Sequence, residues 1–158
     1  MRNPIGKFAL TAALALSAST ALAAGPFTAF AGNWKGAGRI FDIHGKTEPL
    51  SCRSTNQPAP DGIAMTLSLV CASDSYRIDF HSDLYTDGHN LRGTWSEKVY
   101  EATGNMSGDI QGDSITAIAN APGFDATIVA HLDGANKLDV SLKAHGVSID
   151  HVTAVMKR

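Results

Sequence analysis

The side chains that could carry chemistry in this 158-residue chain are chiefly six histidines and two cysteines. His44, His89 and His145 each stand beside a glycine at a predicted turn, and His81 and His131 fall on the polar faces of alternating segments. No two histidines lie two or four residues apart, so no local pair is placed to hold a metal ion. We predict no metal site. Serines and aspartates are plentiful, but they form no pattern that selects a catalytic residue or calls for a cofactor.

The two cysteines, Cys52 and Cys71, are predicted to form a disulfide. They make no Cys-x-x-Cys motif and have no histidine close by in the sequence, which argues against a metal pair. A reactive thiol is the remaining alternative. Two cysteines in a chain exported to an oxidising compartment are usually paired with each other, and the N-terminus gives a reason to expect export.

Residues 1–23 have the three parts of a secretory signal peptide. Arg2 and Lys7 supply the positive start, residues 8–16 form a mostly apolar run too short to span a bilayer, and Ala21-Leu22-Ala23 offers a small-x-small cleavage site. An amphipathic helix is the alternative, but the segment has few polar residues. We expect a periplasmic or secreted protein with a mature chain of residues 24–158. No later stretch is apolar for long enough to cross a membrane.

The charge balance excludes some partners. The formal net charge is −2, and loss of Arg2 and Lys7 with the signal makes the mature chain more acidic. A mildly acidic chain with interspersed charges is a poor candidate for nucleic acid or an anionic membrane surface. The mature length suits one domain with one core. The oligomeric state is not predicted.

Alternation between apolar and polar residues dominates the mature chain, most clearly over residues 63–71, 76–80, 124–132 and 138–142. This period predicts strands with one buried face. Short breaks rich in glycine, aspartate and proline separate the strands, as tight hairpins require. We predict an all-β, antiparallel, up-and-down barrel of roughly eight to ten strands, because closure removes the exposed edges of a meander. A β-sandwich is the alternative.

This strand pattern supports the disulfide. Cys52 and Cys71 fall on the inward faces of successive strands, and a hairpin around Asp61-Gly62 would place them opposite each other. The bond would close a loop of about twenty residues.

Four aromatic residues are candidates for lining a ligand cavity: Trp34, Tyr76, Phe80 and Trp95. The alternative is that they fill the interior, which is the more common role of aromatic side chains in small barrels.

Two polar residues join this candidate ligand site. Glu97 shares the parity of Trp95 and is predicted to point inward, where a carboxylate needs a partner. Arg39 or His151 could supply one, since strict alternation puts His151 on the side of Ile149. The alternative is a bulge that shifts the parity and leaves Glu97 and His151 facing solvent.

The first predicted strand begins with Gly32-Asn33-Trp34-Lys35-Gly36. A Gly-x-Trp at this place resembles the start of lipocalins and other calycin barrels, and the resemblance implies that Trp34 plugs one end of the barrel. The chain shows no clear C-terminal helix of the kind that typical lipocalins have. Its strand count is closer to the fatty-acid-binding and nitrobindin-like branches of that group.

A second resemblance covers most of the mature chain. The segment from Leu91 to Glu97, with Cys71 to Arg77 and Pro122-Gly123-Phe124, is similar to a family of small exported proteins of alphaproteobacteria. That resemblance implies an envelope location and a disulfide, and it implies no activity.

The predicted barrel architecture says more about function than any sequence motif in the chain. A barrel of this size can hold one small molecule, so we expect a noncatalytic barrel that binds a small, mainly apolar ligand. The alternative is a protein-interaction module of the cell envelope, since short exported disulfide barrels also resemble bacterial metalloprotease inhibitors.

Overall fold

The computed structural model describes residues 24–158, which form one short 3-10 helix and ten strands. In chain order these are η1 (Pro26–Phe30), β1 (Gly32–Asp42), β2 (Thr47–Pro58), β3 (Ala64–Ala72), β4 (Arg77–Thr86), β5 (Asn90–Glu97), β6 (Ala102–Gln111), β7 (Ser114–Ala121), β8 (Phe124–Leu132), β9 (Lys137–His145) and β10 (Ile149–Lys157). The predicted signal peptide, residues 1–23, lies outside the described residues.

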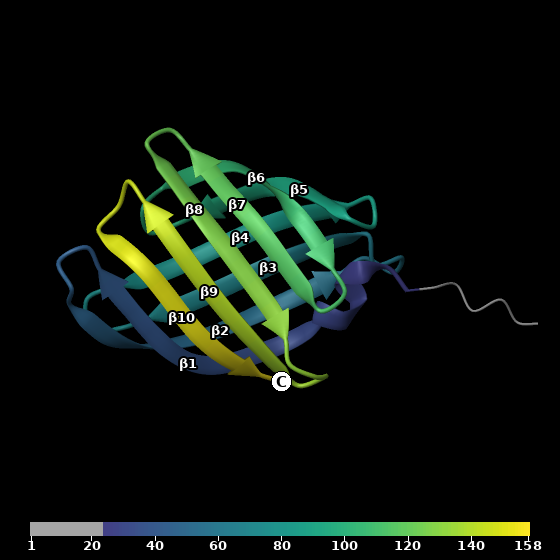
Figure 1. The fold of residues 1–158 in the computed structure, drawn as a ribbon, viewed down its shortest axis with the longest axis horizontal. Helices are drawn as coiled ribbons and strands as arrows, with labels where there is room; N and C mark the ends of the chain where they lie inside the picture. The colour runs from purple at the N-terminus through teal and green to yellow at the C-terminus, as the bar shows by residue number, and fades with distance from the viewer. Residues whose placement is uncertain (1–23) are drawn as a thin grey trace, which may run out of the picture.

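The ten strands close into a barrel. Each strand pairs antiparallel with the next, and β1 pairs with both β2 and β10. Figure 1 shows β8, β9 and β10 crossing in front of β2, β3 and β4. The predicted up-and-down barrel is therefore confirmed. The sandwich alternative is wrong, because two separate sheets would not pair β1 with β10.

Strict alternation sets the inside and the outside of the wall. Along β2, every second residue from Glu48 to Asn56 is buried, and the residues between them are exposed or half-buried. Gly36 and Gly38 interrupt the inward row of β1, where an added Cβ atom would meet carbonyl oxygens of β10. Glycine is required there because the two backbones come so close together.

The disulfide joins β2 to β3. Cys52 and Cys71 are direct partners in the antiparallel register, their sulfurs are bonded, and both side chains are buried on the inner face. The structure confirms the predicted bond together with the hairpin register on which the prediction depended.

Most turns fall at the glycines that the sequence marked. Positive φ angles occur in the turns at Gly45, Gly62, Gly88, Gly112, Gly123, Gly134 and Gly146. The β5–β6 turn, residues 98–101, contains no glycine and was not anticipated. Glu101 takes the positive φ there, at 53°, and it is the one non-glycine residue of the described chain to do so.

One end of the barrel is closed by η1, which lies at the right of Figure 1. Phe27 and Phe30 of this helix are fully covered. The backbone N–H groups of Gly25 and Phe27 donate to the carbonyls of Asp61 and Gly62, each at 3.0 Å. These bonds fix the start of the described chain across the β2–β3 turn.

Trp34 completes this closure. Its ring is fully buried and its Nε1 donates to the carbonyl of Phe30 at 3.1 Å. The Arg158 guanidinium lies 4.6 Å from the centre of the Trp34 ring and donates to the carbonyls of Ala29 and Ala31. Trp34 therefore plugs this end, as the Gly-x-Trp resemblance implied.

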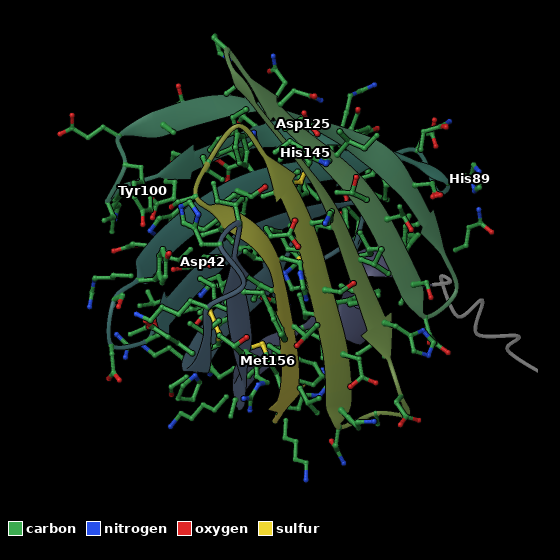
Figure 2. All side chains as sticks on the ribbon, turned by 60° about the vertical axis from the view of Figure 1, so that its left-hand side comes forward. Asp42, His89, Tyr100, Asp125, His145 and Met156 are labelled. Carbon is green, nitrogen blue, oxygen red and sulfur yellow. A yellow bond between two sulfur atoms is a disulfide. The ribbon has the colours of Figure 1, made fainter. Side chains whose placement is uncertain are left out.

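The opposite end is formed by the β1–β2, β3–β4, β5–β6, β7–β8 and β9–β10 turns. We call it the open end, because no helix of the described chain covers it. Figure 2 labels four of its residues, Asp42, Tyr100, Asp125 and His145, together with His89 of the closed end.

Candidate functional site

The barrel interior is the candidate site, because some of the apolar side chains that face it are not fully covered. Some are almost wholly covered, such as Leu50 at 2% and Met65 at 3% exposure. Others face inward in the same rows but stay partly exposed, and these include Leu67, Leu69, Phe80, Ile128 and Leu142. The second group therefore faces the interior of the barrel without being fully covered. We call the interior of the barrel the lumen.

Three aromatic rings form one wall of the interior. Phe80 and Trp95 stack with ring centres 5.9 Å apart, and Trp95 meets Phe124 edge to face at 5.4 Å. The Trp95 Nε1 donates to the carbonyl of Asn105 at 3.1 Å, so its polar atom is satisfied by the wall. The structure brings the predicted residues Phe80 and Trp95 together and adds Phe124, which the sequence analysis did not select.

Glu97 points inward beside this wall, as predicted from its parity. Its cross-strand neighbour is Phe80, and only 9% of the residue is exposed. Oε1 accepts the backbone N–H of Asp79 at 2.6 Å, and Oε2 accepts that of Tyr100 at 2.7 Å. The expected partners, Arg39 and His151, are not its partners in the structure. Glu97 instead caps the β5–β6 turn with Oε2 and holds the backbone of β4 with Oε1.

Tyr76 and Tyr100 lie near Glu97 at the open end. Tyr76 is half-buried against the core, and Tyr100 is exposed in the β5–β6 turn. Partial burial, together with the negative charge of Glu97 and the nearby Tyr76, raises the pKa of Tyr100. The phenol of Tyr100 is thus kept neutral beside the entrance.

His151 does not belong to this group. Phe41 pairs with His151 but Asp42 pairs with Ile149, so Asp150 is an extra residue in β10. This bulge shifts the parity, as the alternative interpretation allowed. Ile149 packs on the core, whereas His151 stacks on Phe41 with ring centres 3.9 Å apart. That ring lies on the outer face, since Phe41 follows the inward Ile40.

A second carboxylate site at the open end was missed by the sequence analysis. Glu48 of β2 is buried, and its carboxylate contacts Lys46 Nζ at 2.5 Å. Ser73 Oγ and the backbone N–H and Oγ of Ser75 also donate to it. The Lys46 ammonium, followed by the Ser75 and Ser73 hydroxyls, lowers the pKa of Glu48 to about 2. This cluster ties the β1–β2 turn to the β3–β4 turn.

Polar groups also occur deeper in the barrel. Ser54 and Asn56 of β2 and Ser82 of β4 are buried on the inner face, and Leu67 pairs with Asn56 on one side and Ser82 on the other. Asn56 Nδ2 donates to the carbonyl of Phe30 at 3.0 Å, and Ser82 Oγ donates to that of Thr94 at 3.0 Å. Asn56 Oδ1 is the one buried side-chain nitrogen or oxygen in residues 24–158 that has no hydrogen-bond partner.

The described residues hold no group of three histidine, cysteine, aspartate or glutamate side chains that could bind a metal ion. Within the same residues, no helix combines the length and the apolar character that a membrane span needs. On the outer face, a shallow groove of about 390 Å³ crosses strands β1, β8, β9 and β10. Val129, His131, Ser141 and Val155 are among its lining residues.

The closed antiparallel meander of ten strands, plugged at one end, is an all-β barrel with a calycin-like fold. No protein-family model matches the sequence, and no curated protein matches it. Among solved structures, Rv2717c from M. tuberculosis is similar with a TM-score of 0.65 at 15% identity, covering 83% of this chain and 93% of that chain. The S-type phycobiliprotein lyase CPES from Guillardia theta is similar with a TM-score of 0.59 at 14% identity, covering 84% and 89%. At such identities the likeness shows the fold alone.

Proposed function

We propose that the protein is a noncatalytic barrel that binds a small, mainly apolar ligand in its lumen. The supporting observation is the partial exposure of inward side chains such as Leu67, Leu69 and Ile128. Protein interiors are close-packed, so a filled barrel would cover these residues as it covers Leu50 and Met65. The likeness to a phycobiliprotein lyase supports a small-ligand role by fold analogy only.

The proposed binding residues follow from where the side chains lie. Phe80 and Trp95 offer apolar ring surface, and Tyr76 and Glu97 stand nearer the entrance. Trp34 has no exposed surface to offer a ligand, and the outward His151 is separated from the lumen by the wall. We therefore propose the first four as ligand neighbours and assign Trp34 to closure of the barrel.

Filling the lumen tests the proposal. N-phenyl-1-naphthylamine, an uncharged dye that brightens in apolar surroundings, should bind the folded protein. Ile128→Trp adds volume where the inward face borders free space, so dye affinity should fall at least tenfold with little loss of stability. Ile110→Trp makes the same change at an inward residue that is only 2% exposed, where overpacking should cost about 1–3 kcal/mol.

The result that would contradict the proposal is also specific. Failure of the dye to bind, together with equal destabilisation by Ile128→Trp and Ile110→Trp, would mean that the interior is filled. Urea titration measures the stability of both variants, and dye fluorescence measures binding.

We also propose that the protein is periplasmic or secreted. The proposal rests on the signal-like pattern of residues 1–23 and on the Cys52–Cys71 disulfide, which suits an oxidising compartment. N-terminal sequencing of the protein from its own cells should begin near Ala24. An intact Met1 in a cytoplasmic fraction would contradict this.

A protein-interaction role is the second candidate, because apolar side chains are exposed around the open end. Ile43, Val99, Tyr100 and Val147 lie in three of its turns and are each more than two-fifths exposed. If this end inhibits a protease, purified bacterial metalloproteases should lose activity in its presence. The Val99→Ser/Tyr100→Ser variant should then relieve the inhibition without changing dye affinity.

A further inference from the structure

The buried charges of the described chain all have one sign. Glu48 and Glu97 are its only buried charged residues, and both lie toward the open end. No lysine or arginine of residues 24–158 is buried. At the open end the Lys46 ammonium pairs with Glu48, and Glu97 accepts two backbone N–H groups. A ligand that passes further into the lumen meets no buried cation. A carboxylate or phosphate group on the ligand would be desolvated without a positive partner, which is strongly unfavourable.

The deeper polar site is an acceptor. Asn56 is 4% exposed, and its amide orientation is fixed because Nδ2 donates to the Phe30 carbonyl. Oδ1 is therefore left facing away from that carbonyl without a donor. A buried acceptor without a partner is costly, and native proteins usually supply one. Ser82 cannot fill the role where it stands, because its hydroxyl donates to Thr94.

Asn56 lies beside inward apolar side chains that are not fully covered. Its cross-strand neighbour Leu67 faces inward in the same layer and is partly exposed to the lumen. The adjacent inward pair, Ser54 and Leu69, continues the same border toward the middle of the barrel.

We propose that the lumen selects an uncharged ligand with a hydrogen-bond donor at its leading end, and that Asn56 Oδ1 accepts that donor. The ligand class is an apolar chain or ring that carries a hydroxyl or amide N–H, as opposed to a fatty acid or other anion. This inference rests on the proposed function, because it names the chemistry of a ligand in the same lumen.

Three probes, each with an unbranched ten-carbon chain, separate the possibilities by displacing N-phenyl-1-naphthylamine from the intact protein at pH 7. Decan-1-ol has a donor, decyl methyl ether has only an acceptor, and decanoate is an anion. Decan-1-ol should bind about tenfold more tightly than the ether, which corresponds to one hydrogen bond. Decanoate should bind at least tenfold more weakly than the alcohol.

Two variants locate the donor site. Asn56→Ala should bring the ratio of alcohol affinity to ether affinity close to one. Because both probes are measured on the same variant, a loss of affinity that affects both equally does not change this ratio. Ser82→Ala, a matched removal of a buried inward polar group, should keep the tenfold ratio. If Asn56→Ala does not fold, the comparison of the three probes on the unaltered protein still decides the ligand class.

The failures can be told apart. If none of the probes displaces the dye because the dye itself does not bind, the proposed function fails and this inference fails with it. If the dye and all three probes bind but the alcohol and the ether bind with equal affinity, the ligand does not donate to Asn56 Oδ1. Only this inference is then overturned. Preference for decanoate would overturn the charge argument.

Discussion

Removing the Cys52–Cys71 disulfide should lower the free energy of unfolding by about 3 kcal/mol. The two cysteines are separated by 19 residues in sequence, and a loop of that size loses roughly this much unfolded-state entropy when it is closed. The bond links adjacent strands of a continuous barrel wall, so its loss removes no backbone pairing. The cost should therefore appear as stability and leave the fold intact.

Substitution and reduction separate two contributions to this cost. Cys52→Ala/Cys71→Ala removes the cross-link and also two buried sulfur atoms, so packing loss adds to the entropy term and the total should fall within about 2–5 kcal/mol. Chemical reduction of the unaltered protein removes only the cross-link. The difference between the reduced protein and the double variant then reports the packing of the sulfurs.

Urea titration monitored by tryptophan fluorescence gives the three free energies. We expect the oxidised protein to be the most stable, then the reduced protein, then the double variant. Equal midpoints for the oxidised and reduced forms would refute the entropy argument. Two free thiols per chain in unfolded, unreduced protein would refute the bond itself.

Three further predictions concern single side chains. In folded protein the pKa of Glu48 is lowered from 4.5 to about 2, so the ionised carboxylate stabilises the fold fully above pH 4.5 and loses this effect as the pH falls toward 2. The stability difference between the unaltered protein and Glu48→Gln, measured by urea titration, should therefore shrink over that interval. Arg158→Ala should cost about 1–2 kcal/mol by loosening the Trp34 plug, whereas Lys157→Ala, an exposed neighbour, should cost almost nothing. Trp95→Phe keeps the stack on Phe80 but loses the bond to Asn105, so thermal unfolding should show a loss of about 1 kcal/mol, and a loss above 3 kcal/mol would contradict the assigned contacts.

The fold could be predicted because the signals for it are local and repeated. Alternation of apolar and polar residues set the inner face of each strand, and glycine marked most turns. The opposed cysteines added one long-range constraint on register, which the structure confirms. Closure of β1 on β10 was inferred only from the cost of exposed edges, since no residue pattern specifies that contact.

The errors of sequence reasoning arise where one residue departs from its local pattern. Asp150 adds a residue to β10 and moves His151 to the outer face, and nothing in the alternating sequence distinguishes that bulge from a regular strand. The β5–β6 turn has no glycine, so the role of Glu97 as its cap was hidden. With the turn unmarked, Glu97 looked like a charge that needed a distant cation.

The lumen could not be predicted for a different reason, because alternation reports the side of the wall and not what fills the interior. Met65 and Leu67 stand two residues apart on the same face of β3, yet Met65 is covered and Leu67 is partly exposed. The side chains that cover an inward residue come from strands distant in the sequence, and some of them, such as Ala117 and Ala119, are small. Whether a calycin-like barrel has room for a ligand therefore depends on many residues far apart in the sequence.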